Sequence, residues 1–193
     1  MLSDILKKET APLHEALEKT LFSKDIFSGA FDLEKYRLVL HINFVVHEVL
    51  EPQLFAALGP HAAPLSLAAR SKSEALQKDM QQAGLDVNID QNMVPPAPRF
   101  DTPAQALGGL YVLEGATLGG RVIVKHLKQQ DIFSTTPFFY YNVYAAETGT
   151  YWTSFLDVLN QANEAPDEVV TGARKIYHYY LEVAAAFIAA TKN

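Results

Sequence analysis

The sequence predicts an all-α protein that folds as a single domain, and three observations lead to this. Apolar residues recur at helical spacing in one segment after another. No segment shows the strict alternation of apolar and polar residues that a half-buried strand shows. The chain has 193 residues, of which 49% are hydrophobic, which is enough material for one core. We therefore expect residues 1–193 to form one helical domain.

The amino-terminal segment carries an apolar stripe with a histidine beside it. The stripe consists of Leu13, Leu17 and Leu21. Because Pro12 closely follows Thr10, we expect a helix start there and a break or kink near Thr10. His14 lies next to the stripe, and Glu18 follows one helical turn later. This histidine is placed to be a ligand, although a core-edge imidazole satisfied by a carboxylate is the ordinary alternative.

Further helices follow along the chain, separated by turn residues. We expect them at residues 31–58, 67–82, 102–127, 152–159 and 167–191. Residues 86–101 contain three prolines and no usable period, so we expect a loop within the domain. The last helix is expected to turn one set of side chains inward: Ile176, Tyr177, Tyr180, Val183, Ala184 and Phe187.

The helix at 102–127 is unusual because five glycines fall between Gly108 and Gly120. Each costs about 1 kcal/mol relative to alanine in a helix interior, so a structural or functional reason is needed. Gly115 and Gly119 are four residues apart, as are Ala116 and Gly120, and together they predict a groove free of side chains. A close helix crossing of the small-xxx-small kind is the ordinary explanation. The spacings of the phosphate-binding glycine motifs are not present.

Composition excludes several classes of function. The 16 basic residues are outnumbered by 22 acidic ones, and this balance argues against nucleic-acid binding and polybasic membrane binding. There is no cysteine, which excludes disulfides, thiolate metal sites and cysteine nucleophiles. The first residues lack the apolar core of a signal peptide, and no run approaches eighteen apolar residues. We expect a cytoplasmic protein with no membrane segment.

The pattern H-E-x-x-E occurs twice, from His14 to Glu18 and from His47 to Glu51. Two such motifs leave a dimetal carboxylate and histidine oxidase open as an alternative. A dimetal bundle of the usual kind would carry E-x-x-H, and a zinc protease would carry H-E-x-x-H, and neither is present. We therefore interpret the two stretches as amphipathic helices with ordinary solvated charges.

Three groups of residues, taken together, resemble bacterial heme oxygenases, most closely the branch associated with bacteriophytochromes. They are Leu6-Lys7 before Leu13-His14 and Glu18; the run from Tyr111 through Glu114-Gly115-Ala116-Thr117-Leu118-Gly119-Gly120; and Glu147-Thr148-Gly149 before Trp152 and Phe155. The resemblance spans most of the chain. It implies the helical heme oxygenase fold, with heme between the first helix and the glycine-rich helix.

The resemblance also implies site residues. His14 corresponds to the axial ligand of the heme iron, Glu18 to the partner of its other ring nitrogen, and Lys7 to a lysine that reaches a heme propionate. The position of a second such lysine is Ala11. Gly115, Gly119 and Gly120 correspond to the catalytic distal face. The remaining heme contacts are expected from Ala116, Tyr177 and Tyr180.

The resemblance also shows one departure: animal members of the family carry an aspartate where this chain has Ala116. Bacterial members that resemble this chain lack that aspartate too, so we interpret Ala116 as a feature of the branch. Other groups must then order the distal water, and Glu114, Thr117 and backbone carbonyls are the candidates. Basic residues at the end of this helix, Arg121, Lys125 and Lys128, could receive an acidic electron donor, although a solvated helix terminus explains them equally well.

The implied activity is oxidative cleavage of heme to biliverdin, carbon monoxide and ferrous iron, with molecular oxygen and electrons from an external donor. Heme would be both substrate and cofactor, and the absence of a flavin or nucleotide motif implies a ferredoxin or flavoprotein reductant. We expect a monomer or weak dimer. A noncatalytic heme-binding protein and the dimetal oxidase are alternatives on the same fold, whereas a thiaminase-like relative would require a cysteine.

Overall fold

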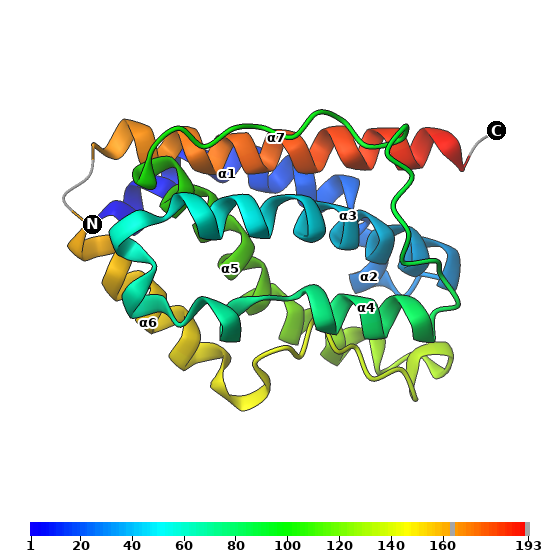
Figure 1. Cartoon of the computed structure of the whole chain (residues 1–193). Helices are drawn as coiled ribbons and strands as arrows, with labels where there is room; N and C mark the ends of the chain where they lie inside the picture. The colour runs from blue at the N-terminus through cyan, green and yellow to red at the C-terminus, as the bar shows by residue number, and fades with distance from the viewer. Residues whose placement is uncertain (163–164, 192–193) are drawn as a thin grey trace.

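The structure is a computed structural model that describes residues 1–162 and 165–191, and within these residues every regular element is a helix (Figure 1). The α-helices are α1 (Leu2–Thr20), α2 (Ser23–Ser28), α3 (Leu33–Ala57), α4 (Ser73–Gln82), α5 (Pro103–Leu127), α6 (Thr148–Gln161) and α7 (Pro166–Ala190). Short 3₁₀ turns occupy Gly59–His61, Ala63–Leu65, Leu67–Arg70, Asp131–Phe133 and Ala145–Glu147. The prediction of an all-α fold is confirmed.

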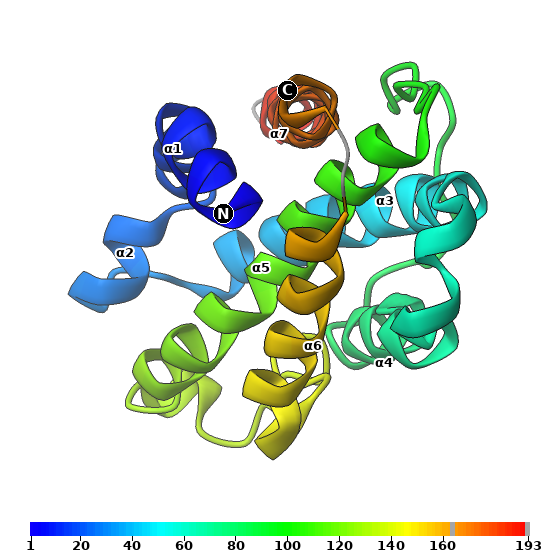
Figure 2. The ribbon, with the colours of Figure 1, turned by 90° about the vertical axis from the view of Figure 1, so that its left-hand side faces the viewer.

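Helices α5 and α7 form the centre of the packing, and α1, α3 and α6 pack around them. Figure 2 shows α5 crossing beneath α7, with α1 and α2 on one side. The crossing is close because two glycines face carbonyls: a Cβ on Gly108 would overlap the carbonyl of Val169, and a Cβ on Gly172 would overlap that of Gln105. The small-xxx-small explanation therefore holds for the first half of α5, not for the segment Gly115–Gly120.

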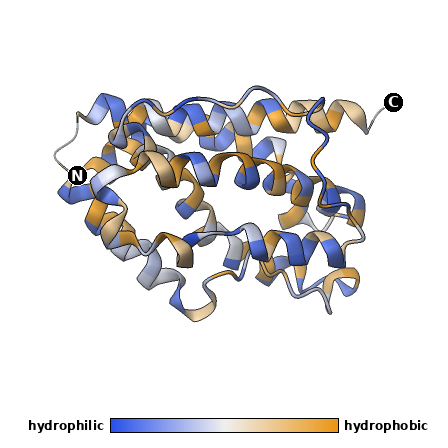
Figure 3. Cartoon of the chain, viewed as in Figure 1, coloured by the Kyte–Doolittle hydropathy of each residue, from blue (hydrophilic) through white to orange (hydrophobic). Residues whose placement is uncertain are grey.

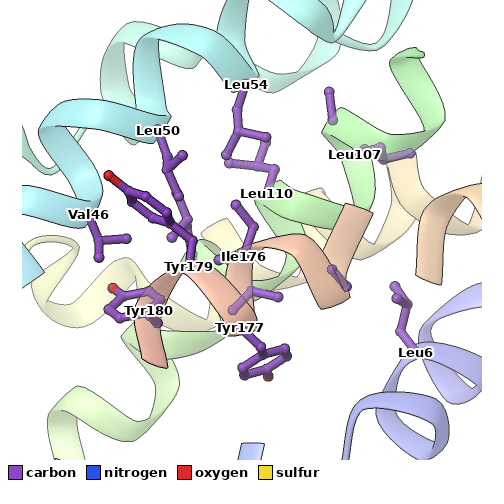
Figure 4. Close-up of a cluster of buried hydrophobic side chains, with 14 of the residues drawn as sticks. Leu6, Val46, Leu50, Leu54, Leu107, Leu110, Ile176, Tyr177, Tyr179 and Tyr180 are labelled. Atoms are coloured by element: carbon purple, nitrogen blue, oxygen red, sulfur yellow. The ribbon is translucent and has the colours of Figure 1, made fainter. Parts of the chain in front are cut away.

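The core has two parts. The larger lies mainly between α3, α5 and α7, and Figure 4 shows leucines such as Leu50, Leu54 and Leu110 meeting Ile176 there. The smaller is aromatic and lies between α2, α3, α4 and the chain after α5, with Phe133 and its neighbours fully buried. Figure 3 shows that α3 and α7 mix hydrophilic and hydrophobic residues along their length, because each has one face in the core and one in water.

The first helix is continuous, so the break expected near Thr10 is wrong. α1 runs from Leu2 to Thr20 with Pro12 inside it. The Thr10 side chain is buried and its hydroxyl donates to the carbonyl of Leu6 at 2.8 Å instead of capping a new helix. Pro12 is exposed, so water can satisfy the carbonyl that lacks a helical partner.

The helix expected over residues 67–82 is interrupted. A 3₁₀ turn ends at Arg70, Ser71 is extended, and α4 begins at Ser73. The reason is a distant carboxylate: Glu51 accepts hydrogen bonds from the Ser71 hydroxyl at 2.8 Å and from the Lys72 backbone N–H at 3.0 Å. The loop expected at 86–101 is confirmed, as is the start of α5, where the Thr102 hydroxyl accepts from the backbone of Gln105.

Helix α5 is the one described helix that is long and apolar enough to cross a membrane by length and composition. Half of that apolar window is buried against the other helices. This pattern is typical of the core helix of a globular protein.

Candidate heme site

His14 lies on an exposed face of α1 and has one ring nitrogen free. Its Nδ1 is 3.7 Å from Oε2 of Glu18, and the two side chains are 59% and 56% exposed. Within residues 1–162 and 165–191, Nε2 of His14 makes no hydrogen bond or ion pair. An imidazole held from one side by a carboxylate and open on the other can act as a metal ligand. His14 is more exposed than the core-edge alternative implies, and its role as a ligand stays a prediction.

Tyr177 of α7 contacts the His14 ring and confirms the predicted inward direction of this side chain. The two rings meet edge to face, with centroids 6.3 Å apart. Tyr177 is buried, and burial together with the neighbouring Tyr111 of α5 raises the pKa of its phenol to about 12. The phenol therefore stays neutral. Tyr177 lies between His14 of α1 and Tyr111 of α5.

Helices α1 and α5 have few direct contacts and are linked mainly through their neighbours. At one end, the backbone N–H of Ser3 donates to Oδ1 of Asn160 on α6 at 3.1 Å. At the other end, Phe27 of α2 meets His126 of α5 edge to face at 4.9 Å. Figure 2 shows α1 and the carboxyl-terminal half of α5 on the same side of the molecule. Helix α2 contacts both of them.

The glycines of α5 have different surroundings. A Cβ on Gly119 would meet nothing within 4 Å, and a Cβ on Gly115 would make ordinary contact with Trp152 at 3.7 Å. A Cβ on Gly120, in contrast, would lie 2.9 Å from the carbonyl oxygen of Tyr141. The predicted groove is therefore open at Gly119. At Gly120 the prediction is wrong, because this glycine is buried against the chain that follows α5.

The open face of α5 is apolar. Two large apolar side chains on this face, Leu118 and Val122, are 40% and 48% exposed. Ala116 is also exposed, so the position that carries an aspartate in animal relatives faces solvent here. An exposed set of apolar side chains next to an open glycine is typical of a surface that receives an apolar partner or ligand.

Two predicted heme contacts have different positions in the structure. Lys7 is exposed on α1, where its flexible side chain is free to reach an anion. Tyr180 is buried, and its hydroxyl donates to Oδ1 of Asn43 on α3 at 3.0 Å. Among the described residues Tyr180 has no ring contact with His14, so the structure does not bring Tyr180 to this site.

The second H-E-x-x-E stretch is buried, so our interpretation of it as solvated charges is wrong. Nδ1 of His47 donates to Glu51 at 2.7 Å, and Nε2 lies 3.0 Å from the hydroxyl of Tyr140. Burial raises the pKa of the Glu51 carboxyl, but His47 and Lys72 outweigh this effect and leave the pKa below its usual range. His47 and Glu51 therefore have a structural role, and no group of three metal-binding side chains occurs among the described residues.

Glu114 is the centre of a buried ion cluster that the sequence analysis missed. Its carboxylate pairs with Arg70 and Lys72 and accepts a hydrogen bond from the Tyr144 hydroxyl at 2.8 Å. Arg70 also donates to the carbonyl of Tyr151 on α6 at 3.2 Å. The Glu114 side chain is thus fully engaged, and our expectation that it orders water over the heme is not supported.

Thr117 is engaged in a similar way. Its hydroxyl donates to the carbonyl of Glu114 at 2.7 Å, and the side chain is buried. Backbone carbonyls along the open half of α5 are the candidates that remain for distal water.

The described residues fit a heme. Nε2 of His14 is open for the iron, and Gly119 leaves space for a flat group against the helix backbone. Leu118 and Val122 offer apolar contact, and Lys7 offers a positive charge for a propionate.

Comparison with known proteins identifies the class and then the family. The fold matches the crystal structure described as the NO- and CO-bound heme oxygenase from Neisseria meningitidis, with a TM-score of 0.74, 20% identity, and coverage of 97% of this chain and 92% of that one. The structure therefore has the helical heme oxygenase fold. A sequence model of the family described as "Heme oxygenase" matches residues 1–186. The chain belongs to the heme oxygenase family, as its sequence predicted.

A curated relative agrees with this assignment. The protein named "Heme oxygenase" from Xanthomonas campestris pv. campestris (strain 8004) is 31% identical over 114 residues. The matched segment covers 58% of this chain and 66% of the relative. These comparisons favour the heme oxygenase assignment over the dimetal alternative.

Proposed function

We propose that this chain is a cytoplasmic enzyme that opens heme oxidatively to biliverdin, carbon monoxide and ferrous iron. The observation that carries the proposal is the pair of open faces in a heme oxygenase family member: His14 with a free Nε2 on α1, and Gly119 with empty space around it on α5. Bound heme supplies the iron that activates oxygen and the porphyrin that is oxidised.

In this proposal His14 is the axial ligand and Glu18 orients it. Oε2 of Glu18 lies 3.7 Å from Nδ1 of His14, where its charge can orient the ring and leave Nε2 to bind the iron. The Tyr177 ring supports the imidazole from α7, and Lys7 pairs with a propionate. Ala11, which stands where relatives have a second lysine, cannot contribute to this anchoring.

On α5, Gly115, Ala116 and Gly119 form the surface that faces the reacting side of the heme. With no side chain larger than a methyl group, they allow backbone carbonyls to approach bound ligands and hold ordered water. Leu118 and Val122 exclude bulk water when heme covers them. The direction in which oxygen is aimed would then be set by the shape of the helix, since no acidic side chain is available at Ala116.

We further propose that electrons come from a ferredoxin or flavoprotein and that the enzyme is a monomer or weak dimer. The acidic composition argues against a nucleic-acid partner. The relation to the bacteriophytochrome-associated branch stays a prediction. Basic residues near the end of α5, Lys125 and Lys128, are exposed and available to an acidic donor.

The test is a hemin titration followed by turnover. The purified protein should develop a Soret band that saturates at one equivalent of hemin, and reduction under oxygen should convert this band to bilin absorbance with release of carbon monoxide. Saturable binding without bilin would identify a noncatalytic heme protein and reject the proposed activity. No saturable binding, together with stoichiometric iron or manganese in the protein as purified, would support the dimetal alternative instead.

A further inference from the structure

The proline-rich segment 94–100 runs alongside α7 (Figure 1), and a cavity lies between this segment and the helix. Its volume is about 360 Å³, which lies within the range of small-molecule sites. The α7 side is formed by a stripe at helical spacing that includes Arg174, His178 and Glu182. Tyr177, which faces His14, is not among the residues that line this cavity.

The wall opposite α7 is fixed in place by Lys175. Its ammonium group donates to the carbonyl of Arg99 at 2.7 Å and to Oε1 of Gln105 at 2.6 Å, and it lies 5.9 Å from the centroid of the Phe100 ring. Because these contacts occupy the Lys175 donors, this lysine builds the cavity and has little left for a ligand. The cavity is thus bounded by an anchored segment and a helix.

The other charged and titratable side chains of the cavity, those of Arg174, His178 and Glu182, give it a positive end and a negative end. Arg174 pairs with Glu9 through Nη2 at 3.0 Å, which leaves its other guanidinium donors open. His178 and Glu182 are exposed and make no hydrogen bond or ion pair among the described residues. The positive end at Arg174 and the negative end at Glu182 are separated by two helical turns, with His178 between them.

Apolar and aromatic groups line the cavity beside these charged side chains. Pro96 and Pro98 line one side, and the buried Tyr179 lines the other. A ligand that uses every part of this site carries an anion at one end, a cation at the other and an apolar segment between them.

We propose that this cavity binds a small zwitterion whose carboxylate lies at Arg174 and His178 and whose ammonium lies at Glu182. Along the helix axis His178 lies about 6 Å from Glu182 and Arg174 about 12 Å, so a carboxylate held between His178 and Arg174 lies about 6–9 Å from an ammonium at Glu182. An extended amino acid with a terminal amine, or a dipeptide with an apolar side chain, has this form. The site is separate from the proposed heme site and does not depend on heme cleavage.

The test uses 6-aminohexanoate as the probe, with hexanoate and hexylamine as matched compounds that each lack one charge. Nuclear magnetic resonance of the isotope-labelled full chain without heme reports binding and folding together. 6-Aminohexanoate should shift the signals of residues 171–182 and 96–98 in a saturable way, and each matched compound should bind about fivefold more weakly. Equal binding of hexanoate, or no shift in this region at millimolar probe, would overturn the proposal.

Substitutions test which residue binds each charged group of the probe. Glu182→Gln should weaken 6-aminohexanoate two- to fivefold without changing hexanoate, and Arg174→Gln should weaken both. Glu9→Gln is the control for Arg174, since it removes the partner and leaves the guanidinium, so affinity should be kept or increased. Glu34→Gln, an exposed acid at the start of α3, should have no effect. If Glu182→Gln leaves 6-aminohexanoate binding unchanged in a folded protein, the cavity does not recognise a zwitterion.

Discussion

His47 donates a 2.7 Å hydrogen bond from Nδ1 to Oε1 of Glu51, and both side chains are almost completely buried, at 0% and 4% exposure. His14 and Glu18 have the same spacing but lie 3.7 Å apart and are more than half exposed. One sequence pattern thus serves two purposes: the buried pair stabilises the fold, and the exposed pair is available to a ligand.

The first prediction concerns the stability of these two pairs. His47→Ala should lower the free energy of unfolding by about 2–4 kcal/mol, because it leaves the Glu51 carboxylate buried without its partner and removes a contact of Tyr140. His14→Ala should change it by less than about 0.5 kcal/mol, since that side chain is exposed. Urea unfolding of the apoproteins measures both values, and similar losses for the two variants would contradict this division.

The second prediction concerns pH. The pKa of Glu51 is lowered from 4.5 in the folded protein because His47 and Lys72 outweigh burial, so its carboxylate stabilises the fold above about pH 4.5 and loses that contribution as the pH falls through the folded pKa. Glu51→Gln should therefore cost about 1–3 kcal/mol at pH 7 and progressively less in acid. The measurement is the difference in unfolding free energy from the original protein at several pH values. A difference that does not vary with pH would show that the charge of Glu51 is not involved.

Neighbouring tyrosines on α7 provide the third prediction. The Tyr180 hydroxyl donates to Asn43, whereas the buried Tyr179 hydroxyl has no hydrogen-bond partner among the described residues. Tyr180→Phe should cost about 1 kcal/mol, and Tyr179→Phe should be neutral or stabilising, because it removes a buried polar group without breaking a bond. Thermal unfolding of the two variants makes the comparison, and a larger loss for Tyr179→Phe would reveal a partner for that hydroxyl.

The helices could be predicted because their signals are local. Apolar spacing, the Thr102 and Pro103 start of α5 and the prolines of the loop at 86–101 act within a few residues of chain. The expected break near Thr10 was wrong because the tertiary fold keeps α1 continuous through Pro12. Local sequence rules describe only the preference of a segment. In α1, packing against α7 keeps the helix continuous despite that preference.

The buried ion cluster could not be predicted in this way. Glu114 meets Arg70 and Lys72, which are more than forty residues earlier in the chain, and no local pattern links them. The burial of His47 had a partial signal, since the helix around it is far more apolar than the helix around His14. The ligand role of His14 came from the resemblance to the heme oxygenase family, since its local pattern is the same as that of His47, and it stays a prediction.

The fourth prediction separates the α5 glycines. Gly119→Ala should stabilise the apoprotein by up to about 1 kcal/mol, because its Cβ meets nothing and alanine is the better helix former. Gly120→Ala should destabilise it by about 1–3 kcal/mol, because its Cβ approaches the Tyr141 carbonyl. If Gly119 faces the reacting side of heme, Gly119→Ala should also lower the bilin yield per heme consumed. Unchanged yield from a stabilised variant would remove Gly119 from the site.

His14 is the residue on which the proposed heme site depends most, and a hemin titration of His14→Ala tests its role directly. The control is His178→Ala, which removes another exposed histidine, located on α7 away from the proposed heme site. We expect the control to keep the Soret band of the original protein. His14→Ala should lose this band and all bilin formation while staying folded, and added imidazole should restore part of the spectrum. An unchanged Soret band and bilin yield in folded His14→Ala would contradict the proposed site.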